Sequence, residues 1–338
     1  MIDYVKIYLE KIDLKRLIFS TGLDFNGGLS KTTGEINETV LVAHYHFCKI
    51  TIYNAKSQNP HVLFTGSIHK LWNDLNGIKA PNYNPNKPYK GFNGNQFTIN
   101  DIVEVRTYLE TLFDCKASQM IFQNIEFGVN AIIDFNPYHY LKGLLYHKNI
   151  LFEFSHYGNN AQVQHQNTIF KIYNKSYQFK MNENVLRVEL KIMKMIELKF
   201  LDIRTFSDID EIILANVQKM LLKRFDEVMH YDYSIDKKKL TKRELEAIKS
   251  YSNPRYWIED LKPIHRDRHK KKLGKITQLY SKQLHQKIKT EILEKCVMIN
   301  QLSQKAKCVT VNRSSIVINI TQKQPYNSLT LNSILVQG

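Results

Sequence analysis

The feature that most constrains the fold is a series of segments rich in β-branched and aromatic residues, several of them with alternating apolar and polar positions. Alternation places successive side chains on opposite faces of a strand and is typical of a half-buried sheet. The segments are residues 3–9, 40–53, 62–71, 119–133, 168–173 and 185–194, of which 40–53 is either a strand or the arm of a hairpin. The first two hundred residues therefore predict a sheet.

Helices are predicted between and after these strands. Thr98 is a suitable N-cap, and apolar residues then recur on one helical face up to Leu112. Pro137 suits the first turn of a short helix over residues 137–145. Helical spacing dominates residues 209–229, 241–250 and 268–299, whereas the segment rich in Pro, Asn and Gly at 73–95 predicts a long loop.

We therefore expect an α+β fold in which an antiparallel sheet with packed helices is followed by a basic helical region. The units at residues 40–112 and 119–189 could be two related halves, although no sequence repeat proves it. The expected domains cover residues 1–205, 206–303 and 304–338. The last is a loose polar tail with one β-like run at residues 315–321.

The net charge of +16 and the pI of about 9.4 favour a polyanionic partner. Nucleic acid fits because many aromatic residues lie among the basic ones; a merely soluble basic protein and a binder of anionic membranes are the alternatives. The spacing of the four cysteines matches no paired metal site or disulfide framework, which favours a reducing cytoplasm. No apolar run is long enough for a membrane span, and no signal peptide is evident.

Two cation-rich stretches lie in the helical region, at residues 237–249 and 265–275, with Tyr256 and Trp257 between them. Cations on a helix near aromatic rings suit contact with the DNA backbone and stacking on bases. A solvated charged helix face explains each stretch equally well on its own. The residues expected to bind DNA here are Lys270, Lys271 and Lys272.

His44 and His46 occupy positions i and i+2 of a predicted strand, so both imidazoles would point to one face. Two such imidazoles can bind a divalent metal, and a His-x-His strand upstream of a tyrosine is the layout of the HUH nickases. The alternative is a pair of solvent-facing histidines.

The segment TIFKIYNKSYQFK, residues 168–180, holds two tyrosines among three lysines. A phenol can attack a phosphodiester if its proton is removed and a cation steadies the phosphate oxygens. Tyr173, Tyr177 and Lys175 are therefore catalytic candidates, with Lys171 and Lys180 as phosphate contacts. Because the chain has 19 tyrosines, such a cluster could also arise by chance.

Glu126 and Glu189 each lie inside an otherwise apolar strand. A buried carboxylate is costly unless it is paired or bound to a metal. Arg187 lies on the same strand face as Glu189, so an ion pair is one explanation, and ligation of Mg²⁺ or Mn²⁺ is the other. Arg187 is also a candidate DNA contact.

The segment GSIHKLWN, residues 66–73, could bring backbone close to a phosphate at its glycine. His69 and Lys70 are the candidate DNA contacts in it. His69 could equally be an ordinary surface residue of a strand.

These motifs occur in the order in which they occur in a known family. Over residues 1–205 the chain resembles the gene II type replication initiator of filamentous phages and related phage and plasmid replication proteins. The segments that carry the resemblance are VLFTGSIHKLWN, QNIEFGVNA, FKIYNKSYQ and VLRVELKIMKMIELKFL. At residues 44–46 the family keeps only the second histidine.

The resemblance implies a metal-dependent nickase with Tyr173 as the nucleophile and Tyr177 as a backup or neighbour. It also implies functional roles for Glu126 and Glu189, and a nicking domain built on an antiparallel sheet. The expected activity is nicking and joining of single-stranded or supercoiled origin DNA to start rolling-circle replication, with host helicase and polymerase as further partners. The alternatives are a non-catalytic origin-binding protein and an RNA-binding protein.

Overall fold

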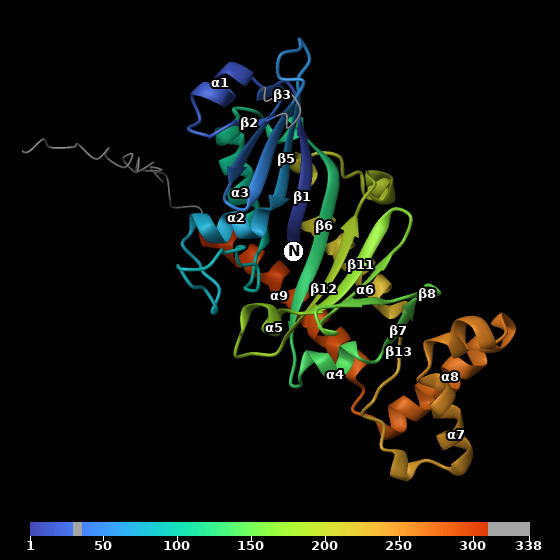
Figure 1. The fold of residues 1–338 in the computed structure, drawn as a ribbon. Coiled ribbons are helices and arrows are strands. Elements are labelled where there is room, and N and C mark those ends of the chain that lie inside the picture. Colours follow the sequence, from blue (N-terminus) through green and yellow to red (C-terminus); the bar gives the residue numbers. More distant parts are fainter. Residues whose placement is uncertain (30–35, 310–338) are drawn as a thin grey trace, which may run out of the picture.

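The computed structural model describes residues 1–29 and 36–309 (Figure 1). Its largest element is a ten-stranded sheet in which every neighbouring pair of strands is antiparallel. In spatial order the strands are β2 (Asn26–Leu29), β3 (Ile36–Tyr45), β4 (Cys48–Tyr53), β5 (His61–Ser67), β1 (Ile2–Leu9), β6 (Met120–Ile132), β12 (Val185–Ile192), β11 (Thr168–Asn174), β10 (Asn160–Gln164) and β9 (Glu153–Ser155). The expected α+β class with an antiparallel sheet is confirmed.

The sheet consists of two halves with the same strand order. We call β1–β5 the N-terminal half and β6 with β9–β12 the C-terminal half. The first strand of each half, β1 or β6, lies at the centre of the sheet, and the later strands of that half approach it in order from the edge. The halves meet where β1 pairs with β6.

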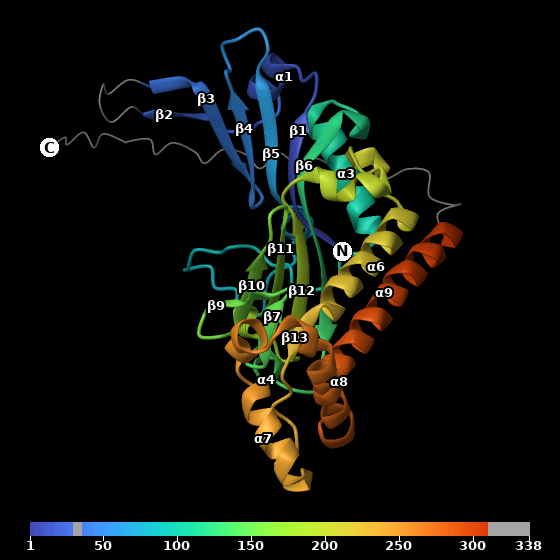
Figure 2. The same ribbon diagram turned by 90° about the vertical axis from the view of Figure 1, so that its right-hand side faces the viewer.

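Helices cover one face of the sheet. Figure 2 shows α3 (Ile99–Phe113), α6 (Glu211–Asp226) and α9 (Leu284–Val309) on the same side. Alternate residues of the strands point into this layer, and Phe127, Ile172 and Val188 are almost fully buried there. The opposite face of the sheet is therefore left for polar side chains. No helix in the described part of the chain has the length and apolar character to cross a bilayer.

Local capping explains where two helices begin. Thr98 and Asp101 form a capping box at the start of α3, as the sequence predicts. Ser67 accepts a hydrogen bond from the amide of Lys70 and so starts α2 (Ile68–Leu75). The prediction of a strand through residue 71 is therefore wrong, because the chain turns into a helix at Ser67.

The prediction of one continuous helix over residues 268–299 is also wrong, because the structure has two helices there. α8 (Pro263–Tyr280) ends at Ser281, and α9 begins at Leu284. The carboxylate of Asp232 accepts hydrogen bonds from the Ser281 hydroxyl at 3.1 Å and from the Leu284 amide at 2.9 Å. This buried carboxylate satisfies a backbone and a side-chain donor at the break between the helices. The sequence of residues 268–299 alone does not predict the break.

The helical region packs in two places. α6 and α9 bury apolar residues in the core beneath the large sheet. α7 (Lys242–Tyr251) and α8 form a smaller core around Trp257, next to the three-stranded sheet β13 (Val228–His230), β7 (Leu144–His147) and β8 (Ile150–Leu151). The domain limits at residues 205 and 303 remain predictions. Of the expected tail, residues 304–309 continue α9, and residues 310–338 lie outside the described residues.

Candidate active site

The uncovered face of the C-terminal half carries a cluster of polar side chains. In β11 and β12, Lys171, Tyr173, Arg187 and Glu189 alternate with residues buried in the core beneath the helices. The register places Lys171 opposite Glu189, and Glu189 opposite Gly128 of β6. Period-two alternation therefore brings side chains from three strands to one place.

Gly128 leaves the space that this cluster needs. A Cβ atom at this position would lie 2.7 Å from Cγ of Glu189 and 2.9 Å from a guanidinium nitrogen of Arg187. Both distances are below ordinary van der Waals contact, so any side chain larger than hydrogen would displace the charged groups. The glycine thus lets two charged side chains cross directly over the strand.

Asp3 of β1 joins the cluster from the N-terminal half. The pairing of β1 with β6 shifts register between Ile2 and Val5. Val5 and Ile2 both point into the core beneath the helices, whereas Asp3 reaches Arg187 on the open side. The sequence analysis missed Asp3, although a carboxylate in the run IDYVKIYL is the same signal that identified Glu126 and Glu189.

The acidic groups are paired with two cations. Arg187 contacts Asp3 at 3.0 Å and also donates through Nε to Glu189. Nζ of Lys171 lies 2.6 Å from a carboxylate oxygen of Glu126 and 3.6 Å from one of Glu189. All three carboxylate side chains are almost completely buried, which makes these pairings essential to their charge.

The pairing splits the pKa values of the three acids. Burial and the nearby charge of Glu189 raise the pKa of Glu126 to about 7. Burial also acts to raise the pKa of Glu189, but Arg187 and Lys171 outweigh it and hold that pKa below its usual value. Burial is likewise outweighed at Asp3, where Arg187 and Lys175 hold the pKa well below its usual range. Asp3 and Glu189 are thus ionised at neutral pH, and Glu126 is poised between its two forms.

The hydroxyl of Tyr173 donates a hydrogen bond of 2.7 Å to Oε1 of Glu189. Burial and the charge of Glu189 raise the pKa of Tyr173 well above 10, so the phenol is neutral at physiological pH. A general base must be ionised and must accept a hydrogen bond from the group that it deprotonates, and Glu189 meets both requirements for the phenol of Tyr173.

Lys175 approaches the same ring from the start of α5 (Lys175–Phe179). Its Nζ lies 4.9 Å from the centroid of the Tyr173 ring and donates to Oδ1 of Asn93 at 2.5 Å. Burial and Arg187 lower the pKa of Lys175 to about 7. Asn93, from the loop after α2, is a second residue that the sequence analysis missed, because a lone Asn in a loop carries no distinctive signal.

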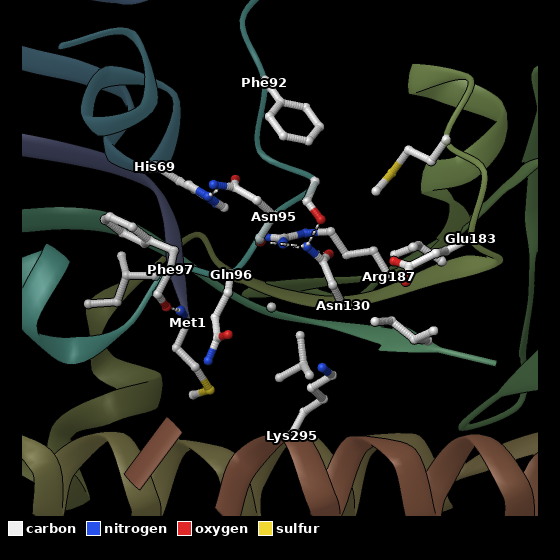
Figure 3. A pocket seen from close by; sticks show the side chains of 17 residues that line it. Met1, His69, Phe92, Asn95, Gln96, Phe97, Asn130, Glu183, Arg187 and Lys295 are labelled. Atoms are coloured by element: carbon white, nitrogen blue, oxygen red, sulfur yellow. Dashed lines mark hydrogen bonds between the residues drawn. The ribbon is translucent and has the colours of Figure 1, made fainter. Parts of the chain in front are cut away.

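These groups line a cavity of about 690 Å³ on the open face. Asp3, Glu126, Glu189, Lys171, Tyr173 and Lys175 all reach it, and Lys70, Lys90, Tyr177 and several amide side chains complete the wall. Figure 3 shows a separate, smaller hollow of about 310 Å³. Arg187 lines this smaller hollow and donates a hydrogen bond of 2.9 Å to Oδ1 of Asn130 there.

The predicted His-x-His strand is corrected by the structure. His44 is the exposed last-but-one residue of β3, but His46 lies in the β3–β4 turn with φ of 44°. Its Nδ1 lies 2.7 Å from Oδ2 of Asp74 in α2. The two imidazoles therefore do not share a strand face, and neither belongs to the acidic cluster. Metal binding by His44 and His46 remains a prediction.

The remaining predicted residues fall into three groups. Tyr177 and Lys70 line the cavity, and Lys171 and Arg187 are held in its ion pairs. His69 is buried, stacks on Phe97 at 4.6 Å and bonds Asn95 at 2.8 Å, and burial lowers its pKa to about 3, which leaves it neutral. The other predicted residues lie outside the cavity lining: Lys180 at the end of α5 and Lys270 and Lys271 on α8 are exposed, and Lys272 on α8 is half-buried. Their roles in DNA binding remain predictions.

The acidic cluster fits a divalent cation. Asp3, Glu126 and Glu189 each offer one carboxylate oxygen, and these atoms lie within 4.8 Å of one another. An oxygen-only donor set is the one that Mg²⁺ and Mn²⁺ prefer. The ammonium of Lys171 already lies against two of these carboxylates, so the site attracts positive charge. The sequence predicted His44 and His46 as ligands beside Glu126 and Glu189, whereas in this cluster the third acid is Asp3 and no imidazole takes part.

No protein-family model matches the chain, and no curated protein sequence matches it either. Among solved structures, the chain is similar to a rolling circle replication initiator protein from Geobacillus stearothermophilus. The identity is 12% and the TM-score 0.28, and the alignment covers 75% of this chain and 96% of the other.

Proposed function

We propose that this chain is a replication initiator of a phage or plasmid that nicks and rejoins one strand of origin DNA through a covalent tyrosyl 5′-phosphate. Tyr173 is the nucleophile in this proposal. The observation that supports it is the hydrogen bond from the Tyr173 hydroxyl to a buried, ionised Glu189 inside a cavity that is also lined by two further acids and four lysines.

The reaction follows from the positions of these groups. Glu189 takes the phenolic proton as the Tyr173 oxygen bonds to phosphorus, and the bond from phosphorus to O3′ breaks. Glu189 passes the phenolic proton on, directly or through solvent, to the departing O3′, so the free 3′-OH can prime synthesis. Lys175, 4.9 Å from the ring centroid, is placed to neutralise phosphate oxygens while ionised.

Rejoining reverses the same steps, with the 3′-OH as nucleophile and Tyr173 as leaving group. A Mg²⁺ or Mn²⁺ ion held by Asp3, Glu126 and Glu189 would polarise the scissile phosphate when bound. Tyr177 is more exposed than Tyr173 and its side chain lines the same cavity. It is therefore the alternative nucleophile for the second step.

The test is incubation of supercoiled plasmid carrying candidate origin segments with the protein and Mg²⁺ or Mn²⁺. Wild type should relax the DNA and form a protein–DNA adduct that survives denaturation. Tyr173→Phe should lose both, by roughly 10³-fold or more, because the attacking oxygen is absent. Tyr177→Phe is the matched control, as it removes a hydroxyl from the same cavity.

Normal nicking by Tyr173→Phe would disprove the assignment of the nucleophile. Loss of the adduct in Tyr177→Phe alone would move the role to Tyr177. A protein that binds origin DNA with no nicking under any metal would be the non-catalytic origin-binding protein instead. Preference for RNA over DNA in competition, again without nicking, would indicate an RNA-binding protein.

A further inference from the structure

The β3–β4 hairpin forms a third hollow, which the proposed chemistry does not use. It measures about 480 Å³ and is lined from the hairpin by His44, His46, Phe47 and Lys49, and from the neighbouring strands by Thr65 and Tyr4. Tyr4 also lines the cavity that contains Tyr173. The two hollows are therefore adjacent along the open face of the sheet.

The strands between the two hollows carry positive charge on this face. The register aligns His44, Lys49, Thr65 and Lys6 in one row across β3, β4, β5 and β1. Nζ of Lys191 in β12 lies 4.6 Å from the ring centroid of Tyr4 and extends the cations towards the cavity. The residues of β1, β4 and β5 that point to this side from Tyr4 onwards include no carboxylate. A polyanion is the partner that complements such a row.

Phe47 adds an exposed aromatic ring at the tip of the hairpin. It lies at a positive φ of 64° in the turn and is 36% exposed. The ring of Tyr89, from the loop after α2, packs edge-on against it at a centroid distance of 5.5 Å. The same loop contributes Lys90 and Asn93 to the active-site cavity. Phe47 is thus a partly fixed stacking platform next to a row of cations, which is the combination that binds single-stranded nucleic acid.

We propose that this hollow binds single-stranded DNA next to the nick, with Lys49 and His44 contacting a backbone phosphate and Phe47 stacking on a base. In a duplex the base faces are stacked on one another, so Phe47 can serve only an unpaired strand. The inference rests on the proposed function and deepens it, because it assigns the His-Tyr-His segment to holding DNA. Figure 1 shows the strands β3, β5 and β1 of this face with no helix across them.

The test measures binding of fluorescein-labelled dT15 by anisotropy at several salt concentrations. Lys49→Ala should weaken binding, and the slope of log K against log salt should fall by about 0.7 for the lost phosphate contact. Phe47→Ala should weaken binding by about fivefold or more while leaving the slope unchanged, because stacking releases no counterion. The matched control is Lys219→Ala on α6, which removes an exposed lysine from the opposite layer.

Unchanged affinity and slope in Lys49→Ala, relative to Lys219→Ala, would overturn the inference. The inference would also be overturned if unlabelled duplex DNA displaced labelled dT15 as effectively as unlabelled dT15 does. Homopolymeric dT contains no origin, so this assay does not depend on cleavage. If Lys49→Ala behaves as expected but Tyr173→Phe still nicks, the nucleophile assignment fails and the binding site stands. Thermal unfolding of each variant checks that Phe47→Ala remains folded.

Discussion

The two halves of the sheet have the same strand order but different open faces. In the C-terminal half, Arg187 and Glu189 are buried in an ion-pair network with Asp3. In the N-terminal half the same side of β4 and β5 carries Lys49 and Thr65, which are exposed or half-buried and belong to no such network with a carboxylate among the described residues. One arrangement of strands thus supports two kinds of surface, a buried ion-pair network and a solvent-exposed face that carries cations.

The difference between the halves shows that the strand order determines where the polar cluster lies, whereas the side chains determine whether a cluster forms. Both halves place alternate side chains on the open face, but the buried charges that must find partners lie on β6 and β12 of the C-terminal half and at Asp3 of the adjoining β1. The network in turn depends on Gly128, which admits those charges. The following predictions test whether this contrast between the halves is real.

The largest effect on stability is expected from Arg187→Ala. It leaves Asp3 and Glu189 buried without their main counter-charge and should lower the free energy of unfolding by about 3–5 kcal/mol. Thr65→Ala, on the same face of the N-terminal half, should change it by less than about 1 kcal/mol. Urea denaturation measures both, and similar losses in the two variants would contradict the contrast.

A smaller effect is expected from Gly128→Ala. The added methyl group would press on Glu189 and Arg187, so the free energy of unfolding should fall by about 1–3 kcal/mol, and nicking should fall with it. Gly28→Ala in β2 is the control in the N-terminal half, because a Cβ there meets nothing within 4 Å. That variant should be neutral or stabilised by roughly 0.5 kcal/mol. If both variants behave alike, Gly128 has no special role.

The pH dependence of metal binding sharpens the contrast further. The pKa of Glu126 is about 7 in the folded protein against 4.5 ordinarily, so its contribution to stability without metal is greatest below pH 4.5 and is lost as pH rises through 7. A cation must displace this proton, so apparent Mn²⁺ affinity should fall up to about tenfold per pH unit below 7. This change in apparent affinity can be followed as the rise in Tm on addition of Mn²⁺, measured between pH 6 and 8.

Glu126→Gln is the matched variant for this experiment, because it keeps the shape of the side chain and removes the titrating group. The dependence of the Mn²⁺-induced shift in Tm on pH should flatten in it. A wild-type protein whose Tm does not respond to Mn²⁺ at any pH would show that the acidic cluster is purely structural. His46→Asn in the N-terminal half should leave the response to Mn²⁺ unchanged.

Much of the sheet could be predicted from the sequence. The strands around Glu126, Tyr173 and Glu189 lie within a few residues of their expected limits, because alternation reports which residues share a face. Alternation does not report which strand lies beside which. Alternation therefore could not place β1 against β6, and Asp3 was missed although its carboxylate completes the cluster.

The errors at the β3–β4 hairpin and at α2 have local causes. His46 and Phe47 both adopt positive φ in a two-residue turn, which residues of these types favour less than Asn or Gly. A period-two pattern that runs through such a turn looks like one continuous strand. Ser67 looks like a strand residue until its hydroxyl is seen to cap α2. At the β3–β4 turn and at the start of α2, a local change in backbone conformation turns the following side chains away from the strand face that the alternating pattern predicts for them.

The pairing of β1 with β6 has a consequence for any attempt to divide the protein. Asp3 lies on one side of this seam and Glu126 with Glu189 on the other, so neither half alone owns a complete set of acids. A cut between α3 and β6 would also expose two long strand edges, each with unpaired amide and carbonyl groups that invite aggregation. Separately produced fragments should therefore regain activity only by reassembling with each other, which makes the molecule suited to a split-protein complementation format.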